Sequence, residues 1–506
     1  MDGRVRRSRE DPYRVDNLYP FQLSGRDLWS LDLFTVAAEL RGRFKYRTPQ
    51  CYSFMGRLLG DPHAGPAADE SFSQRASICH NFRWLVGQHP GSRTRCLDLS
   101  AVTRTAAAQP KVKAIIIGGG IGGLTVAIAL SKVGIDAQVY ERAPVLREVG
   151  AGIVLSGMAL HVLDGLGLGS AVRSQSIEGI QGDLRSIKGN VLFAIPADEF
   201  SRRLGVVAVL HRAELLALLT QQVDPGRIHL GREFAGFEQD NKGVTVWFEN
   251  GETAQGHVLV GADGVKSAVR TQLIGERPLR YAGYTAWRSV VESDHSRNLN
   301  IVETWGRGRR FGIVPMSRGR IYWFATNNAP EGERDLPGRS RQILSNLFRG
   351  WHEPIEALIE AANEDSILRN DIYDLGPLQR WVHNRVALLG DAAHPMTPNL
   401  GQGACQAIED AVVLAAYLCR SERVDSALIE YQRRRLPRAS QIVLRSRLFG
   451  LVAQCNNPVL CWMRDTTTRL TPSWVAARQL KSPLGFDMLT PSESRLFQNQ
   501  PHDGAS

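Results

Sequence analysis

The sequence lacks any run of about eighteen uninterrupted apolar residues, which is the length that a helix needs to cross a bilayer. Its first residues, MDGRVRRSREDPYR, are charged throughout and contain no apolar segment of the kind found in secretory signals. Four acidic residues, Asp2, Glu10, Asp11 and Asp16, also disfavour a transit peptide. We therefore predict a cytoplasmic protein without a transmembrane segment.

Cysteine pairs with the spacing of a metal or redox site are absent as well. The chain has 7 cysteines, and no two of them form a CxxC arrangement. An odd number of cysteines without such pairs is most simply explained by a reduced protein that holds no metal.

The recognition patterns of nucleic-acid-binding proteins are missing, although the formal net charge is +10. No zinc-finger, homeodomain or RNA-recognition pattern accompanies the scattered arginines, so we expect no nucleic-acid partner. The run RRR at 433–435 is interpreted as the solvated basic face of a helix. The charge excess would steer anionic ligands such as dinucleotides and carboxylates.

The length of 506 residues predicts two or three domains, and 43% hydrophobic and 22% charged residues are typical of globular proteins. Residues 1–110 form an irregular extension, with one amphipathic helix indicated at 28–44. A disordered leader and a regulatory or partner-binding domain are both open for it. From 111 to about 440 strands, turns and helices alternate, and 441–506 predicts helices followed by a polar tail.

A glycine cluster opens the alternating region. In KAIIIGGGIGGLTVAIALSKVGIDAQVYERA, an apolar strand is followed by Gly118, Gly120 and Gly123 in GxGxxG spacing, and then by an amphipathic helix over 124–132. A second strand ends at Glu141. In such a unit the glycines make the turn, admit a pyrophosphate and let helix and strand approach, while the acid accepts hydrogen bonds from ribose hydroxyls. The pattern predicts a dinucleotide site.

Two later segments repeat the arrangement of a buried strand followed by glycine and aspartate. HVLVGADGVKSAVR (257–270) contains Asp263 and Gly264, and RVALLGDAAHPMTPNLGQGACQAIEDA starts at 385 and contains Gly390 and Asp391. The second segment continues into a glycine-rich loop and a long helix. Backbone N–H groups at that helix start would attract negative charge.

With these three motifs in this order, residues 111–440 resemble the class A flavin-dependent aromatic hydroxylases. That family includes 4-hydroxybenzoate, salicylate and urate hydroxylases and zeaxanthin epoxidases. The resemblance implies an α/β fold, with a Rossmann-like FAD-binding domain, an inserted antiparallel β-sheet substrate domain and C-terminal helices. It places the FAD domain at about 111–180, 205–275 and 380–420, and the substrate sheet at about 181–204 and 276–379. One departure is Ser156-Gly157, where the family commonly has Pro-Asn.

The resemblance also implies the cofactor contacts. The first motif would bind the ADP half of FAD, Asp263-Gly264 would serve both FAD and NAD(P)H, and Gly390-Asp391 would meet the ribityl and ribose region. Arg212 is similar to an FAD-contacting arginine of the family, and a helix-surface charge is its alternative role. The expected cofactor residues are Gly118, Gly120, Gly123, Glu141, Arg142, Arg212, Asp263, Gly264, Gly390, Asp391, Gly401 and Gly403.

The chemistry implied by the family is hydroxylation. NADH or NADPH reduces the flavin, O₂ adds at C4a, and the resulting hydroperoxyflavin transfers oxygen to an electron-rich aromatic or heteroaromatic ring. Epoxidation of a carotenoid-like or polyene substrate and a non-oxygenating flavin reductase remain alternatives. The Trp-x-Trp-x-Ile stretch that a halogenase would need is absent. A monomer and a homodimer are both open.

The substrate sheet is expected from the alternating segments 243–253, 281–292 and 310–328, the first with a hairpin turn at Asn250-Gly251. Arg288 is the candidate to meet an anionic substrate, with a surface ion pair as its alternative role. His394 and Pro395 are expected to approach the flavin ring, and a helix-cap or structural role is the alternative for His394. Cys405 is interpreted as a small buried residue. Alternation would turn about half of the strand aromatics toward any pocket, but each of them is interpreted as core packing rather than as a substrate contact: Tyr284, Trp287, Tyr322, Trp323 and Phe324.

Overall fold

The computed structural model describes residues 112–146, 151–178, 182–195, 207–293 and 300–471. The chain divides into two units, Met1–Thr105 and Ala106–Ser506, and all described residues belong to the second. The predicted extension 1–110, its helix at 28–44 and the tail beyond 471 lie outside the described residues. Within the described ranges, no helix combines the length and the hydropathy needed to cross a bilayer.

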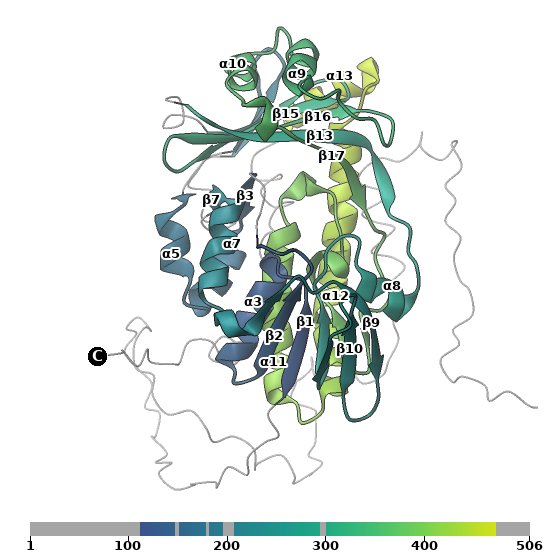
Figure 1. Cartoon of the computed structure of the whole chain (residues 1–506). Helices are drawn as coiled ribbons and strands as arrows, with labels where there is room; N and C mark the ends of the chain where they lie inside the picture. Colours follow the sequence, from purple (N-terminus) through teal and green to yellow (C-terminus); the bar gives the residue numbers. More distant parts are fainter. Residues whose placement is uncertain (1–111, 147–150, 179–181, 196–206, 294–299, 472–506) are drawn as a thin grey trace, which may run out of the picture. The chain divides into compact units, whose positions relative to one another are not determined.

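One sheet carries the glycine motif (Figure 1). Its order is β18-β19-β12-β1-β2-β8, and all neighbours pair in parallel except β18 and β19. The isoleucines at 115–117 are buried, as expected for a parallel strand covered on both faces. The carboxyl ends of the parallel strands therefore meet at one edge. The strands are β1 (Lys113–Ile117), β2 (Asp136–Glu141), β8 (Ile228–Leu230), β12 (Val258–Gly261), β18 (Val382–His383) and β19 (Val386–Leu388).

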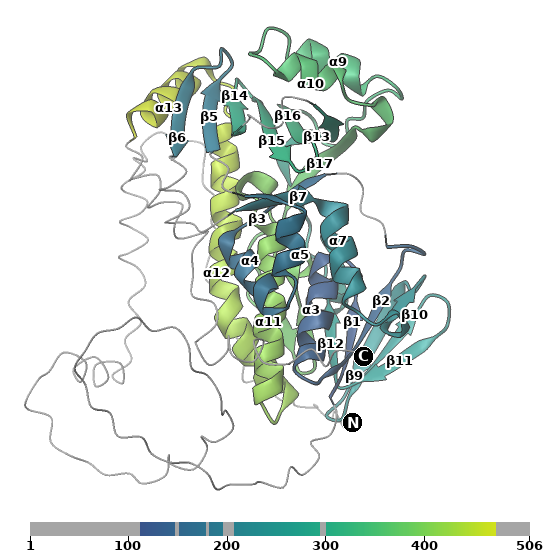
Figure 2. The same ribbon diagram turned by 90° about the vertical axis from the view of Figure 1, so that its left-hand side faces the viewer.

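The helix after the glycine motif differs from the amphipathic helix expected at 124–132. It starts earlier, as α3 (Ile121–Lys132), and its residues from Gly123 to Leu130 are all buried. The long helix α11 (Gly403–Arg420) packs against it and covers the side that would otherwise face water. Figure 2 shows α3, α11 and α12 (Val424–Ala453) side by side.

A second sheet of seven strands has the order β17-β13-β16-β15-β14-β5-β6. Its pairs are antiparallel except β14 with β5. Helices α9 and α10 cover one face, where Trp287 and Trp323 pack with Phe348. The elements are β5 (Gly182–Ser186), β6 (Val191–Ile195), β13 (Arg280–Glu292), β14 (Ile301–Trp305), β15 (Arg309–Met316), β16 (Arg320–Asn328), α9 (Ser340–Leu347), α10 (Ile355–Glu360), the 3-10 turn η4 (Glu364–Ser366) and β17 (Leu368–Asp374).

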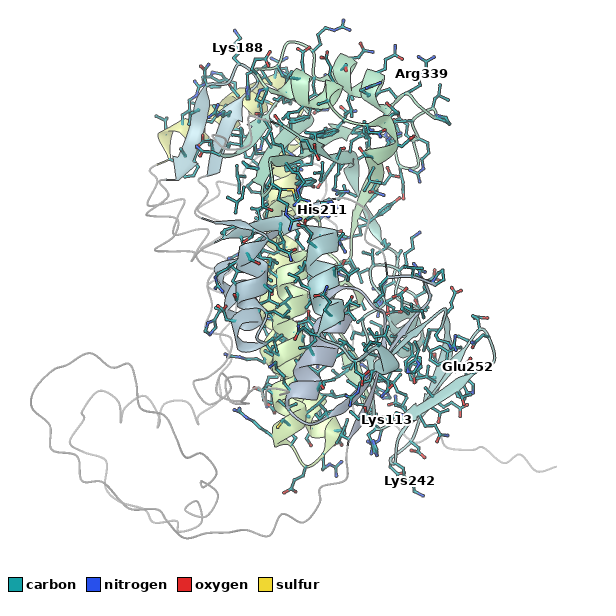
Figure 3. The ribbon with its side chains drawn as sticks, turned by 60° about the vertical axis from the view of Figure 1, so that its left-hand side comes forward. Lys113, Lys188, His211, Lys242, Glu252 and Arg339 are labelled. Carbon is teal, nitrogen blue, oxygen red and sulfur yellow. The ribbon has the colours of Figure 1, made fainter. Side chains whose placement is uncertain are left out.

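The hairpin predicted at Asn250-Gly251 is confirmed, but its assignment to the substrate sheet is wrong. Strands β10 (Val244–Phe248) and β11 (Thr253–Gly256) pair with β9 (Phe234–Gln239) in a separate three-stranded sheet. Phe248 stacks on Tyr140 of β2 at 4.7 Å, so apolar packing draws this sheet to the glycine-motif domain. Its turns carry Lys242 and Glu252, which are labelled in Figure 3.

The remaining elements connect the two larger sheets. Strands β3 (Gly152–Leu155) and β4 (Ile177–Glu178) both pair with β7 (Ala208–His211). Ser156 caps α4, since its hydroxyl accepts from the Ala159 N–H at 3.4 Å, which gives a local reason for serine at this departure from the family pattern. Nearby are α4 (Gly157–Gly165), α5 (Gly169–Ser174), α7 (Arg212–Gln221), the 3-10 turn η2 (Pro225–Arg227) and α8 (Ala268–Ile274).

Helices α11 and α12 are joined by buried charges, and this corrects the prediction for 433–435. Arg433 is exposed, as expected for a solvated face, whereas Arg435 is fully buried. Arg435 donates to Asp410 at 2.6 Å and to Glu409 at 2.7 Å. Arg438 adds bonds to Glu409 at 2.8 and 3.0 Å. The positive face of α12 therefore points partly into the protein, because α11 presents two carboxylates there.

The protonation states of this cluster follow from its contacts. Burial alone lowers the pKa of Arg435, but the carboxylates of Asp410 and Glu409 outweigh it and raise the pKa. Burial raises the pKa of Asp410, while His394 and Arg435 outweigh that effect and hold it below its usual value. These contacts favour the charged forms of Asp410 and Arg435, and removing one partner would leave a buried charge without compensation.

We predict that Arg435→Met lowers the free energy of unfolding by about 3 to 5 kcal/mol. The matched control is Arg433→Met, which removes an exposed arginine of the same helix that is paired with Glu430, and it should cost less than about 1 kcal/mol. Urea unfolding followed by circular dichroism measures both. Equal losses for the two variants would contradict this account of the cluster.

Candidate functional site

The glycine motif forms a tight turn at the carboxyl end of β1. Gly118 has φ +109°, and a Cβ there would overlap the carbonyl of Ala262. A Cβ on Gly123 would overlap the carbonyl oxygen of Gly118. These two positions need glycine for the protein's own packing.

Gly120 differs from its neighbours. Its φ of −77° suits any residue, and a Cβ there would meet nothing within 4 Å. It is the N-cap residue of α3, and no side chain caps this helix start and no acidic residue lies in its first turn. The space beside Gly120 and the N–H groups of α3 therefore fit a phosphate group, which helix starts attract.

Glu141 lies beside this turn at the end of β2. Its carboxylate accepts from the Gly119 N–H at 2.7 Å and from the Ala143 N–H at 2.9 Å. The strand end thus aligns a carboxylate with the glycine turn, which suits ribose hydroxyls next to a pyrophosphate. Arg142 follows and is exposed.

The second motif lies next to the first, at the end of β12. Asp263 accepts from the Ser267 hydroxyl at 2.5 Å and from the Val269 N–H at 3.1 Å, so its carboxylate adjoins the first turn of α8, whose N-cap residue is Ser267. Burial raises the pKa of Asp263, and the bonds from Ser267 and Val269 oppose this. Gly264 has φ +82°, and a Cβ there would meet nothing within 4 Å. The carboxylate is occupied by the protein itself, and its predicted role toward FAD and NAD(P)H stays a prediction.

Arg270 links the second motif to the third and was not identified from the sequence. Its guanidinium is buried and donates to the carbonyls of Ala392 at 3.0 Å, Asp391 at 3.4 Å and Val265 at 2.6 Å. The three bonds hold the loops after β12 and β19 together. The only local signal is that Arg270 lies in the first turn of the helix that Ser267 caps, which does not reveal a partner 122 positions away.

The third motif forms the 3-10 turn η5 (Gly390–Ala392) after β19. Gly390 has φ +60°, and its N–H donates to the buried carboxylate of Asp410 at 3.0 Å. Burial raises the pKa of Asp391, while the charges of His394, Arg212 and Arg270 oppose it. Arg212, at the start of α7, is thus among the charges that act on Asp391, and its predicted contact with FAD stays a prediction.

The glycine-rich loop then passes through η6 (Pro398–Leu400) to the start of α11. Gly401 has φ +62° and open space where its Cβ would be. A Cβ on Gly403 would lie 3.8 Å from the Asp391 carboxylate, so the start of α11 adjoins that group. Within the described residues, the side-chain oxygen of Gln402 is buried without a hydrogen-bond partner. An unsatisfied buried oxygen and an uncapped helix start fit a ligand that supplies polar atoms.

His394 and Pro395 follow this turn and are both buried. His394 Nε2 lies 2.6 Å from Asp410, and its ring lies 5.2 Å from that of Trp381. The Pro395 carbonyl accepts from the Leu375 N–H at 3.1 Å. These contacts give both residues a structural role, and their predicted approach to the flavin ring stays a prediction. Cys405 is fully buried, as expected, and burial raises the pKa of its thiol to about 11.

The seven-stranded sheet presents its second face to the glycine-motif domain. Tyr322 packs against Gly152 of β3, where a Cβ would lie 2.6 Å from its ring. Arg288 donates to Asn370 at 3.2 Å and is near Tyr322, whose pKa burial raises and Arg288 lowers. Of the five candidate aromatics, Tyr284, Tyr322 and Phe324 are on this face, and Trp287 and Trp323 are on the other.

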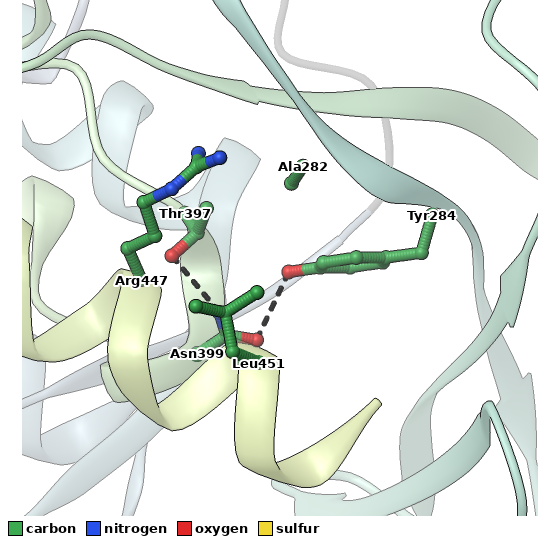
Figure 4. Close-up of a pocket in the computed structure, with 7 residues that line it drawn as sticks. Ala282, Tyr284, Thr397, Asn399, Arg447 and Leu451 are labelled. Atoms are coloured by element: carbon green, nitrogen blue, oxygen red, sulfur yellow. Dashed lines mark hydrogen bonds between the residues drawn. The ribbon is translucent and has the colours of Figure 1, made fainter. Parts of the chain in front are cut away.

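Asn399 connects this face to the third motif. Its side-chain oxygen accepts from the Tyr284 hydroxyl at 3.0 Å and from Arg310 at 2.7 Å, and its amide nitrogen donates to Thr397 at 2.9 Å. Figure 4 shows Asn399 at a small cavity, with Tyr284 on one side and α12 on the other. The cavity is lined by Ala282, Tyr284, Thr397, Asn399, Arg447, Gly450 and Leu451.

Most predicted cofactor residues thus gather at one edge of the parallel sheet, facing the inner side of the seven-stranded sheet. The hydrogen bond from the Ala262 N–H to the Ile117 carbonyl, at 2.8 Å, joins the first motif to the second, and the bond from Arg270 to Ala392 joins the second to the third. No cluster of His, Cys, Asp and Glu in the described part of the chain could hold a metal ion. The arrangement fits a dinucleotide whose far end carries a ring system. That end would lie next to Tyr284, Tyr322 and Phe324 on the inner face of the seven-stranded sheet, which we call the aromatic wall.

Known proteins share this arrangement. A family described as FAD binding domain matches residues 111–446. Aurachin C monooxygenase/isomerase from Stigmatella aurantiaca is 43% identical over 361 residues, which are 71% of this chain and 94% of that protein. FAD-dependent urate hydroxylase from Klebsiella pneumoniae is 37% identical over 346 residues, 66% of this chain and 89% of that protein.

A solved structure agrees with both. Klebsiella pneumoniae HpxO complexed with FAD and uric acid superposes with a TM-score of 0.70 at 32% identity, over 75% of this chain and 98% of that chain. The resemblance inferred from the three motifs is confirmed. The chain belongs to the FAD-binding class A flavin monooxygenase family and is an FAD-dependent enzyme of that family.

Proposed function

We propose that this enzyme hydroxylates a small aromatic or heteroaromatic compound with NADH or NADPH and O₂. The observation that carries the proposal is the position of the third motif, which is tied to the parallel sheet by Arg270 and to the aromatic wall by Asn399. A ring bound between them would be next to both the cofactor site and Tyr284. The urate hydroxylase relative supports a heteroaromatic substrate.

The chain's own residues would bind and orient the reactants. When bound, FAD would be reduced by the nicotinamide and would then activate O₂. The start of α3 would hold the pyrophosphate, Glu141 the adenosine ribose, and Asp391 with the start of α11 the part of the cofactor that adjoins the sheet. Tyr322, Phe324 and the buried inner face would exclude water from the reacting ring.

The substrate class is tested by screening aromatic acids, purines and polyenes against the purified enzyme. We expect an aromatic or purine compound to accelerate NAD(P)H oxidation and to be recovered with one added oxygen atom. H₂O₂ is measured in parallel, because uncoupled oxidation consumes NAD(P)H without product. Acceleration and oxygen insertion only with polyenes would contradict the proposal and assign epoxidation.

The cofactor assignment predicts opposite behaviour for two glycines of one turn. Gly120→Ala should leave the stability of the cofactor-free protein unchanged, since its methyl meets nothing in the protein, and should weaken FAD binding about tenfold or more by occupying the phosphate space. Gly123→Ala should destabilise even the cofactor-free protein, because its methyl overlaps Gly118. Flavin fluorescence titration and thermal unfolding distinguish the two. Unchanged FAD affinity in Gly120→Ala would place the phosphate elsewhere.

Arg288 is the residue we propose to meet an anionic substrate group. For a carboxylated substrate found in the screen, Arg288→Ala should raise KM about tenfold to a hundredfold, which corresponds to a lost charge-assisted hydrogen bond, with a smaller effect on kcat. The matched measurement uses the uncharged amide of the same compound, whose KM should change little. Equal changes in KM for both compounds would show that Arg288 does not bind the carboxylate and acts only through its hydrogen bonds within the protein.

A further inference from the structure

The last turns of α12 expose apolar residues to water, although Ile442 and Val443 of the same helix are buried. Ser446, Gly450 and Ala453 face the protein and are buried. Leucines face outward, with Leu448 51% and Leu451 60% exposed. A surface helix normally buries its apolar stripe and exposes its small and polar residues. The exposed apolar row consists of Leu444, Leu448, Leu451 and Val452.

The next helix, α13 (Pro458–Leu470), also exposes apolar residues. Its buried side carries Cys461 and Arg464, and Arg464 lies 4.9 Å from the ring of Trp305 and donates to the Ala453 carbonyl at 3.1 Å. Its outer side is apolar, and Trp462 is 68% exposed. The exposed apolar residues of α13 are Val459, Leu460, Trp462, Met463 and Leu470.

The two rows are close along the chain, since only residues 454–457 separate the helices, and Figure 2 shows α13 at the end of α12. We call them together the apolar face of α12 and α13. Single exposed apolar residues are ordinary, but nine on two successive helices indicate a surface that binds a partner.

The charged residues beside this face indicate the chemistry of its partner. The segment 441–471 contains one acidic residue, Asp465, and four arginines. Asp465 is paired with Arg464 at 2.9 Å, and Arg447 is paired with Asp374 at 2.8 Å. Arg445 and Arg469 are exposed beside the apolar residues. The face therefore combines aliphatic side chains, an exposed tryptophan and positive charge.

This combination disfavours a second copy of the chain. In a two-fold dimer the same patch meets itself, so the arginines of both copies would be brought together without acidic partners from the patch. The headgroups of an anionic lipid layer supply the missing negative charge, and the acyl region accepts the leucines and the tryptophan.

We propose that the apolar face of α12 and α13 docks on an anionic lipid surface. Leu451 belongs both to this face and to the wall of the cavity beside Tyr284 and Asn399. Docking would therefore place the lipid next to the cavity that adjoins the third motif. The proposal does not depend on the identity of the substrate.

The test is sedimentation of the FAD-loaded full chain with lipid vesicles. We expect it to pellet with vesicles of phosphatidylcholine mixed with phosphatidylglycerol, and less with phosphatidylcholine alone. The double variant Trp462→Ser/Met463→Ser should bind the mixed vesicles at least about tenfold more weakly than the wild type. Arg445→Glu/Arg469→Glu should lose the preference for the anionic lipid.

Two matched controls separate this surface from general effects. Leu336→Ser removes an exposed leucine outside the face, and Arg341→Glu reverses an exposed arginine on α9; neither should change vesicle binding. All variants should keep the wild-type FAD content and unfolding temperature. Absence of vesicle binding by the wild type, or equal binding by Trp462→Ser/Met463→Ser, would overturn the proposal. A wild-type dimer that this double variant dissociates would assign the face to a second copy instead.

Discussion

The buried cluster of Arg435, Asp410 and Glu409 is the interaction on which the site depends. It fixes α12 against α11 through bonds of 2.6 and 2.7 Å, and the same Asp410 holds the Gly390 N–H and His394. A buried ion pair is a weak source of net stability, because desolvation offsets most of its Coulomb energy. Its effect here is positional, since Asp410 bonds the third-motif loop at Gly390 and His394 as well as Arg435 of α12.

Two further side chains extend that constraint to the rest of the site. Arg270 bonds three carbonyls and thereby joins the loops that follow β12 and β19. Asn399 bonds Tyr284 and Arg310 of the seven-stranded sheet. Since Asn399 and Gly390 belong to the same segment, the cluster sets the distance between the cofactor loops and the aromatic wall. Rigid support of this kind is what positioning a ring for oxygen transfer requires.

The sequence predicted those parts of the fold that depend on local spacing. The strand, glycine turn and helix at 113–132 follow from residue types within one short segment, and so does the Asn250-Gly251 hairpin. Arg435, Arg270 and Asn399 have partners 25, 122 and 115 positions away, and no local pattern distinguishes them from surface residues. The hairpin at 243–253 was placed in the wrong sheet for the same reason, because its packing on Tyr140 is a tertiary contact.

The two faces of the seven-stranded sheet have different neighbours: one packs against α9 and α10, and the other faces the cofactor loops. Trp287 and Trp323 are enclosed with α9 and α10, so strand positions are secured from the side away from the cofactor site. This leaves Tyr284, Arg288, Tyr322 and Phe324 available on the inner face, where their neighbours come from β3, β7 and the third-motif loop. Alternation along a strand makes the separation possible, since adjacent residues point to opposite faces. If the substrate binds at the inner face as we propose, substitutions there would change which ring is accepted while the tryptophan layer keeps the sheet folded.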